Sequence, residues 1–148
     1  MRRRQLARAF PALVLLSLVV TACEDSPTAP SHFAPYSQVD IRVGTGTEAT
    51  SGSTVTVNYS GWLYDETKSD RKGLLFDTST GRGTLSFTLG AGEVIAGWDV
   101  GVVGMKVGGL RRLVIPPSLG YGGVRNSLIP PFATLLFEVE LVSVGDES

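Results

Sequence analysis

The side chains that could do chemistry in this sequence are mostly aromatic, with one acid placed among them. Phe76 and Asp77 stand side by side in an otherwise apolar stretch, and Arg82 follows one short turn later. This spacing indicates either a carboxylate that orients or polarises a ligand or a structural ion pair with Arg82. The other aromatic residues on or beside the predicted elements would form either a core or an apolar pocket: Tyr59, Phe87, Trp98, Tyr121 and Phe137.

The sequence lacks the residues that most other reactions need. Cys23 and His32 are its only cysteine and histidine, and both precede the predicted domain. A nucleophilic triad needs a base beside its nucleophile, and a zinc site needs several Cys or His ligands. No strand is followed by a phosphate-binding glycine loop with its lysine. We therefore expect no hydrolase, kinase or metalloenzyme, and neither a metal nor a cofactor.

The composition fits one small β-rich domain. The 148 residues are typical of a single domain with extra segments, and 43% of them are apolar, enough for a core. Thirteen basic and 14 acidic side chains nearly cancel, so no strong field favours nucleic acid as a partner. The 18 glycines favour turn-rich β structure over a helical bundle.

Hydrophobic alternation predicts five strands from residue 38 onward. They occupy residues 39–43, 55–63, 85–89, 110–115 and 135–141. Residues 96–105 alone have helical spacing, and Gly101 and Gly104 weaken that helix by roughly 1 kcal/mol each. Antiparallel sheets with one face buried and the other exposed to solvent produce such alternation. The predicted fold is α+β: a bent antiparallel sheet, or half-barrel, wrapped around one short helix.

The first 22 residues are typical of an export signal. Four arginines within residues 1–8 precede an apolar run at 10–20, which is too short for a membrane-spanning helix of about 20 residues. The run ends in Val20-Thr21-Ala22-Cys23, which resembles the lipobox of bacterial lipoproteins. In those proteins the signal is cleaved before the cysteine, which then carries the lipid. We predict lipidation at Cys23 and a Pro/Ser-rich tether over residues 23–37.

The signal peptide and lipobox predict an extracytoplasmic position at a bacterial cell envelope. The alternative is an ordinary signal peptide with an incidental cysteine. Glu24 follows the cysteine where some lipoproteins have aspartate, which by resemblance favours the outer membrane. His32 lies in the tether and is interpreted as a solvated linker residue.

Ordered motifs along residues 38–144 resemble the FKBP-type peptidyl-prolyl cis/trans isomerases. They are VNYSG (57–61), FDTS (76–79), FTLG (87–90), EVIAGWD (93–99), GYG (120–122), IPP (129–131), ATL (133–135) and FEVEL (137–141). The resemblance implies a pocket between the sheet and the helix, in which X-Pro peptide bonds are isomerised. It assigns residues 38–148 to the isomerase domain.

The resemblance also implies individual roles. Trp98 would form the pocket floor, Asp77 would lie near the substrate carbonyl, and the Tyr121 hydroxyl and Ile95 N–H would donate to the ligand. These make Asp77, Tyr121 and Trp98 the expected catalytic residues. The expected substrate-binding residues are Tyr59, Phe76, Phe87, Val94, Ile95, Ile129 and Phe137.

Two departures from the family pattern concern the pocket rim. Leu85 stands where many members have an aromatic residue, which should thin one wall. The segment 64–75 is longer than in minimal members and the loop 121–129 slightly shorter, and both are expected to border the pocket.

Expected partners are proline-containing unfolded or exported polypeptides, macrolides such as rapamycin, and the membrane through the lipid anchor. Two other functions fit the same sequence. One is a non-catalytic chaperone or peptide-binding module that uses the same pocket. The other is a structural envelope lipoprotein whose aromatic residues are only core. No helical dimerisation arm precedes residue 38, so a tethered monomer is expected.

Overall fold

An antiparallel sheet dominates the part of the chain that the computed structural model describes, residues 33–145. Its strands are β1 (Ser37–Arg42), β2 (Thr54–Tyr64), β3 (Lys72–Thr78), β4 (Leu85–Thr88), β5 (Leu110–Ile115) and β6 (Leu135–Gly145). The strand order is β1-β5-β6-β2-β3, and β4 also pairs with β2. One α-helix, α1 (Ala96–Gly101), and a 3-10 turn, η1 (Pro117–Leu119), complete the elements described.

The long strand β2 pairs with two different strands along one of its edges. Its first residues, 54–57, pair with β4, while residues 60–64 pair with β3. Its other edge pairs with β6 from Thr54 to Leu63. The loop 79–84 therefore interrupts what would otherwise be one edge strand. This interruption matters because β3 and β4 place different side chains beside the helix.

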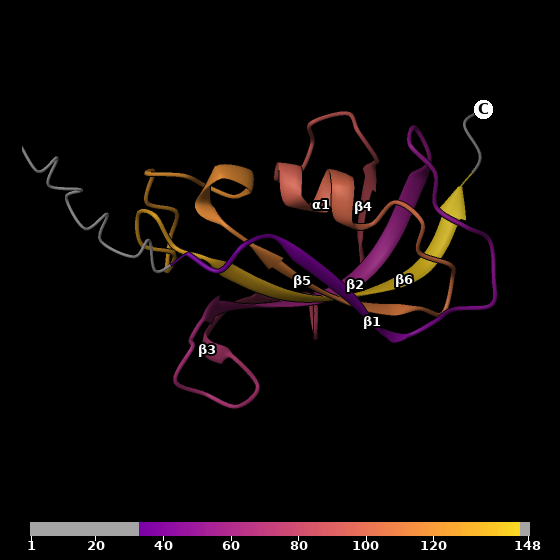
Figure 1. Ribbon diagram of the computed structural model, residues 1–148. Helices are drawn as coiled ribbons and strands as arrows, with labels where there is room; N and C mark the ends of the chain where they lie inside the picture. Colours follow the sequence, from indigo (N-terminus) through magenta and orange to yellow (C-terminus); the bar gives the residue numbers. More distant parts are fainter. Residues whose placement is uncertain (1–32, 146–148) are drawn as a thin grey trace, which may run out of the picture. The chain divides into compact units, whose positions relative to one another are not determined.

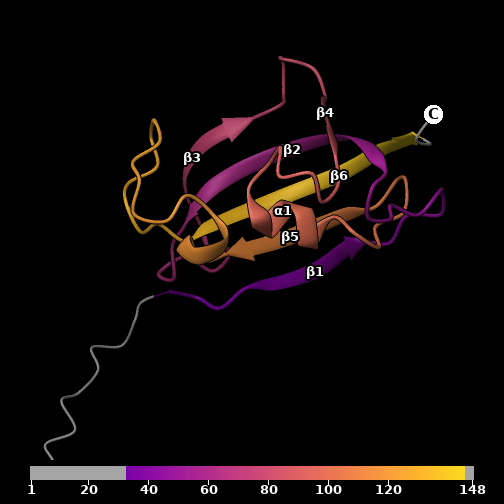
Figure 2. The ribbon, with the colours of Figure 1, turned by 90° about the horizontal axis from the view of Figure 1, so that it is seen from above.

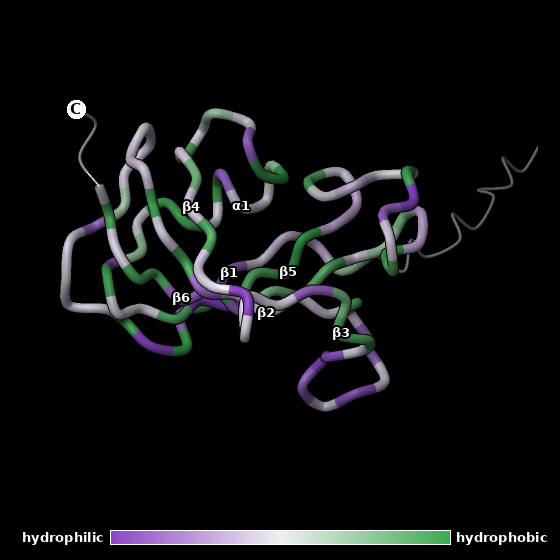
Figure 3. Tube along the Cα trace, turned by 180° about the vertical axis from the view of Figure 1, so that it is seen from behind, coloured by the Kyte–Doolittle hydropathy of each residue, from purple (hydrophilic) through white to green (hydrophobic). Residues whose placement is uncertain are grey.

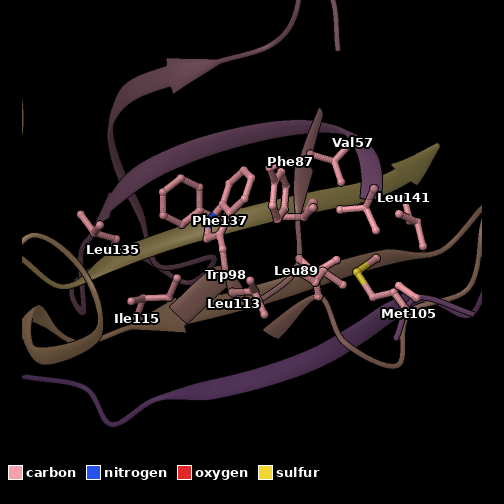
Figure 4. Packing of buried hydrophobic residues seen from close by; sticks show 14 of the residues in the cluster. Val57, Phe87, Leu89, Trp98, Met105, Leu113, Ile115, Leu135, Phe137 and Leu141 are labelled. Carbon is pink, nitrogen blue, oxygen red and sulfur yellow. The ribbon is translucent and has the colours of Figure 1, made fainter. Parts of the chain in front are cut away.

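The helix α1 covers one face of the curved sheet (Figures 1 and 2). The core lies between them and includes Val57, Trp98, Leu113, Ile115 and Leu141, each no more than 3% exposed. Figure 4 shows these side chains converging from α1 and from several strands. Packing of this apolar face holds the six-residue helix in place, since isolated helices of that length are unstable in water.

The predicted α+β half-barrel around one short helix is confirmed, with two local differences. The helix ends at Gly101 and not near residue 105, because Gly104 adopts a φ of 84° that no continuing helix permits. The strand β3 was not predicted. Its Leu74 and Leu75 are both exposed, so it lacks the alternation by which a half-buried strand is recognised.

The predicted signal peptide, Cys23 and the tether up to residue 32 lie outside the described residues. Tyr36 packs against the core, and its hydroxyl donates a 3.0 Å hydrogen bond to Gln38 Oε1. Strand β1 begins at Ser37, next to the predicted start of the domain at residue 38. Within residues 33–145, no helix has the length and hydropathy needed to cross a membrane.

The long segment between β2 and β3 lies away from the helix, on the opposite face of the sheet (Figure 1), and it is strongly hydrophilic (Figure 3). Lys72, at its end, pairs with Glu138 at 2.9 Å and lies 4.3 Å from the centre of the Trp62 ring. Arg112 reaches the same Glu138 oxygen at 2.7 Å. The expectation that residues 64–75 border the pocket was wrong, because these contacts hold the segment to the convex face.

Candidate active site

A cavity of about 160 Å³ opens between α1 and the sheet. Side chains reach it from β2, β3, β4 and β6, from the start of α1 and from the loop after η1. Its lining residues are Tyr59, Phe76, Asp77, Leu85, Glu93, Val94, Ile95, Trp98, Tyr121 and Phe137. Residues distant in sequence thus meet only because the sheet curves around the helix.

Trp98 forms the floor of this cavity and is 3% exposed. Edge-to-face contacts fix its ring: the Tyr59 ring centre lies 5.1 Å away and the Phe137 centre 5.2 Å away. Phe76 packs edge-on against Phe137 at 5.4 Å. Such pairs add about 0.5–1.5 kcal/mol to simple burial, so the floor is rigid. The buried Trp98 Nε1 has no hydrogen-bond partner in the described chain.

Gly61 provides the space that two of these rings occupy. A Cβ at this position would lie 2.6 Å from the Phe137 ring and 2.7 Å from the Phe76 ring. Gly61 pairs with both Phe137 and Asp77 in the sheet register. The absence of a side chain on β2 therefore lets the rings of β3 and β6 meet at the pocket wall.

Asp77 is held in one orientation by three donors. The Tyr59 hydroxyl donates to its Oδ2 at 2.7 Å, and the Thr78 N–H donates to its Oδ1 at 2.9 Å. The Arg82 guanidinium also bonds Oδ1 and donates to the Thr78 carbonyl. The carboxylate at the pocket edge is therefore fixed and charge-balanced.

These contacts separate the pKa values of the acid and the phenols. Partial burial alone would raise the pKa of Asp77, but the hydrogen bonds from Tyr59 and Arg82 outweigh burial and hold it below its ordinary value of 3.8. Burial, with the hydrogen bond to Asp77, raises the pKa of Tyr59 to about 12. Burial and the negative charge of Asp77 also raise the pKa of Tyr121. Asp77 is thus a carboxylate, and both phenols are donors, across the neutral range.

Tyr121 separates this cavity from a second, more polar one of about 260 Å³. Phe76, Asp77 and Tyr121 line both. The second is completed by Arg82 and by residues 126–129, where Asn126 and Ile129 exchange hydrogen bonds of 3.0 and 2.7 Å. A ligand seated over Trp98 can therefore extend past Tyr121 along a polar groove.

The family profile described as FKBP-type peptidyl-prolyl cis-trans isomerase matches residues 45–142. This chain belongs to that family. The FK506-binding protein of Neisseria meningitidis serogroup B is 50% identical to it over 107 residues, which cover 71% of this chain and 92% of the relative. An FK506-binding protein of Streptomyces anulatus is 49% identical over 108 residues, or 71% and 82% of the two chains.

Solved structures agree on the FKBP-type fold. FkpA from Escherichia coli superposes with a TM-score of 0.62 at 41% identity, over 74% of this chain and 47% of that chain. A peptidyl-prolyl cis-trans isomerase from Pseudomonas syringae gives a TM-score of 0.61 at 35% identity, over 75% and 76%. By its family and relatives, this FKBP-type chain is a peptidyl-prolyl cis-trans isomerase.

Most of the expected site residues reach the FKBP-type pocket, but two do not. Phe87, expected on the lining, is 3% exposed and packs behind Trp98, with its ring centre 5.6 Å from the indole. Leu85, two residues earlier on β4, lines the cavity in its place. Ile129 lies in the wall of the second cavity and not over the floor.

Ile95 occupies the position from which its N–H could serve a ligand. It is the N-cap of α1, and its carbonyl accepts the Trp98 N–H at 2.9 Å. Within residues 33–145, no protein group accepts a hydrogen bond from the Ile95 N–H. This donor at the rim is therefore available to a bound peptide.

Glu93 lines the pocket and was not among the expected residues. Its Oε2 accepts the Thr88 N–H at 2.9 Å, which ties the end of β4 to the segment before α1. The sequence feature that could have predicted this role is the position of Glu93 as the first residue of the EVIAGWD motif, directly before Val94 and Ile95. Charged residues beside an apolar pocket are easily assigned to the solvent when only the sequence is known.

Proposed function

We propose that this isomerase assists the folding of exported proteins by binding X-Pro segments in the aromatic pocket over Trp98. The observation that carries the proposal is an apolar floor with a fixed carboxylate at its edge. The clients are proline-containing unfolded polypeptides. No bond is made or broken and no proton is transferred in this reaction. The domain accordingly needs only a pocket and oriented polar groups.

The pocket lowers the barrier by favouring the twisted form of the bond. Resonance keeps the peptide bond planar, and rotation costs about 18–20 kcal/mol. The twisted form has lost conjugation and is less dipolar, so water stabilises it less than the planar form. Rings at the floor and wall replace that water around the prolyl ring. Tyr59, Trp98 and Phe137 supply this apolar surface.

Polar groups at the edge orient the bound segment. The Ile95 N–H and the Tyr121 hydroxyl donate to peptide carbonyls on either side of the proline. Asp77 acts as an electrostatic and orienting group, and not as a base, because its pKa lies below 3.8. Its pairing with Arg82 and Tyr59 serves both the structure and the substrate.

The exported location rests on the sequence before the domain. The basic and apolar segments of residues 1–20 and the Val20–Cys23 lipobox support cleavage before Cys23 and attachment of lipid there. Glu24 supports the outer membrane as the destination. Two or more acyl chains hold a protein stably on a bilayer, so the domain works tethered to the membrane. Mass spectrometry of the purified membrane form tests this, since acylation adds a fixed mass to the N-terminal peptide.

The decisive experiment follows cis/trans exchange in a Leu-Pro peptide by NMR, with the chain from residue 24. We expect acceleration by the wild type and about a tenfold lower kcat/KM for Asp77→Asn, a loss of about 1.4 kcal/mol. The charge that faces the substrate is then gone, while the side-chain shape remains. Tyr59→Phe should lose less, because Arg82 and the Thr78 N–H still hold the carboxylate.

Glu140→Gln is the matched control for Asp77→Asn. It neutralises another ion-paired carboxylate, bonded to Arg42 at 2.7 Å on the convex face, and should leave the rate unchanged. A folded wild type without acceleration would favour the binding-module alternative. Equal rates for Asp77→Asn and the wild type would remove Asp77 from catalysis.

The pH dependence of activity should be flat. Asp77 is ionised down to its lowered pKa, and Tyr59 holds its proton up to about 12. We therefore expect constant kcat/KM from about pH 5 to about pH 9. Activity should fall only below pH 3.8, as protonation removes the carboxylate together with the stability it contributes in the folded state. Circular dichroism at each pH separates unfolding from inhibition, and a midpoint near neutrality would contradict these roles.

Macrolide binding is expected to be weaker than in relatives with a full aromatic wall. The relatives named as FK506-binding proteins support such ligands for this pocket. Leu85, 37% exposed, leaves one wall thin. Leu85→Phe should tighten FK506 binding roughly twofold to twelvefold, by the 0.5–1.5 kcal/mol of an added aromatic contact. Calorimetric titration of both forms measures this, and unchanged affinity would show that position 85 does not contact the macrolide.

A further inference from the structure

An apolar groove of about 450 Å³ lies apart from the active site. It is lined by Phe33, Pro35, Pro116, Pro117 and Phe132, which we call the tether-side patch. Phe33 is 44% exposed and Phe132 is 61% exposed. None of these residues lines the pocket over Trp98 or the adjoining polar cavity. Exposed aromatic rings gathered in one hollow are typical of a contact surface.

The loop holds the Phe132 ring outward at a conformational cost. Phe132 has a φ of 59°, which a bulky residue rarely adopts. Its N–H donates to the Gly122 carbonyl at 2.8 Å, and its ring lies so close to Gly123 that a Cβ there would be 2.8 Å away. The backbone is thus tightly fixed while the ring remains in solvent, a combination that core packing does not explain.

The chain segment that supplies Pro116, Pro117 and Phe132 carries no negative charge. Residues 113–137 contain no aspartate or glutamate, and Arg125 is their single charged residue. The neighbouring Val124 is 71% exposed. An apolar surface with one cation beside it complements a bilayer that contains anionic lipid.

The position of the patch in the chain indicates what covers it. Phe33 follows Cys23 by ten residues. If Cys23 carries lipid, as proposed above, an extended tether of that length reaches at most about 35 Å. A short tether also gives an effective concentration in the millimolar range, at which even a weak surface stays bound.

We propose that the tether-side patch docks on the bilayer, with Phe33 and Phe132 in the headgroup region and Arg125 beside lipid phosphates. The domain then lies against the membrane in one orientation. The residues that line the active pocket over Trp98 are not among the docking residues. This inference rests on the proposed lipid anchor.

The test uses the mature lipidated chain in vesicles of phosphatidylethanolamine and phosphatidylglycerol. With Cys23 blocked by lipid, Val124→Cys provides one free thiol for an environment-sensitive fluorophore. Val142→Cys is the matched control: it is also an exposed valine, 40% exposed, near the C-terminal end of β6. We expect a blue-shifted emission at position 124, no shift at 142, and loss of the shift in Phe33→Ser/Phe132→Ser.

Other outcomes would overturn the proposal. Equal spectra at 124 and 142 would mean that the domain has no fixed orientation. A shift at 124 in soluble Cys23→Ser protein, without vesicles, would mean that the tether or a second copy covers the patch. A persistent shift in the double serine variant would assign it to something other than these rings. Two further measurements are made on the same samples. Leu-Pro exchange shows whether the protein is an active isomerase, and the mass of the N-terminal peptide shows whether Cys23 carries lipid.

Discussion

Trp98→Ala is expected to abolish isomerase activity and to lower the free energy of unfolding by about 3–5 kcal/mol. The indole is 3% exposed, forms the pocket floor and contacts Tyr59, Phe87 and Phe137. Its removal leaves a cavity that water can enter, so the environment favouring the twisted peptide bond is lost. Urea denaturation and Leu-Pro exchange on the same sample measure the two effects.

Leu141→Ala is the control that separates stability from catalysis. Leu141 is fully buried but lies away from the pocket, towards the other end of the core (Figure 4). Its truncation should cost about 2–5 kcal/mol while kcat/KM stays near that of the wild type wherever the protein is folded. If Trp98→Ala kept full activity in its folded fraction, the pocket would not act by excluding water.

Gly97→Ala is expected to destabilise the domain by about 1–3 kcal/mol, although alanine is the better helix former. Helix propensity alone predicts a gain of about 1 kcal/mol. A Cβ at position 97, however, would lie 2.6 Å from Cγ2 of Ile115 on β5. The helix must then lift from the sheet and carry Trp98 with it, so activity should fall together with stability.

Val100→Ala provides the matched comparison within α1. Val100 is 55% exposed, so its replacement removes little packing and reduces β-branching in the helix. We expect a change within about 0.5 kcal/mol and normal activity. A Gly97→Ala protein as stable as Val100→Ala would mean that the helix can move away from Ile115 at no cost. Thermal unfolding of the three proteins decides between these results.

The hydrophobic pattern does not decide whether Leu85 or Phe87 lines the cavity. Both lie on one face of β4, and period two assigns them alike to the interior. Pairing with β2 sets Leu85 opposite Val57 and Phe87 opposite Val55, one step further from the pocket. Only the register of two strands 30 residues apart along the chain places Leu85 at the cavity and Phe87 behind Trp98.

The contacts of Asp77 also depend on how distant strands pair. The sequence places Phe76 next to Asp77 and Arg82 five residues later, which suggested an oriented carboxylate. The Tyr59 hydroxyl reaches Asp77 because the register of β2 and β3 sets Gly61 opposite Asp77, and Tyr59 lies two residues before Gly61 on the same face of β2. The exposed leucines of β3 removed the alternation that would have predicted this strand, and the ion pair between Lys72 and Glu138 holds the long loop on the convex face.

The class of fold, the family resemblance and the kind of chemistry could all be predicted from the sequence. Alternation along each strand is local, and a domain without histidine or cysteine excludes most covalent catalysis. The folded structure was needed to show which rings form the floor, why Gly61 and Gly97 must lack side chains, and that Phe33 and Phe132 line one groove. The physical reason is that periodicity assigns a side chain to a face, whereas register and close approach between distant segments decide what it touches there.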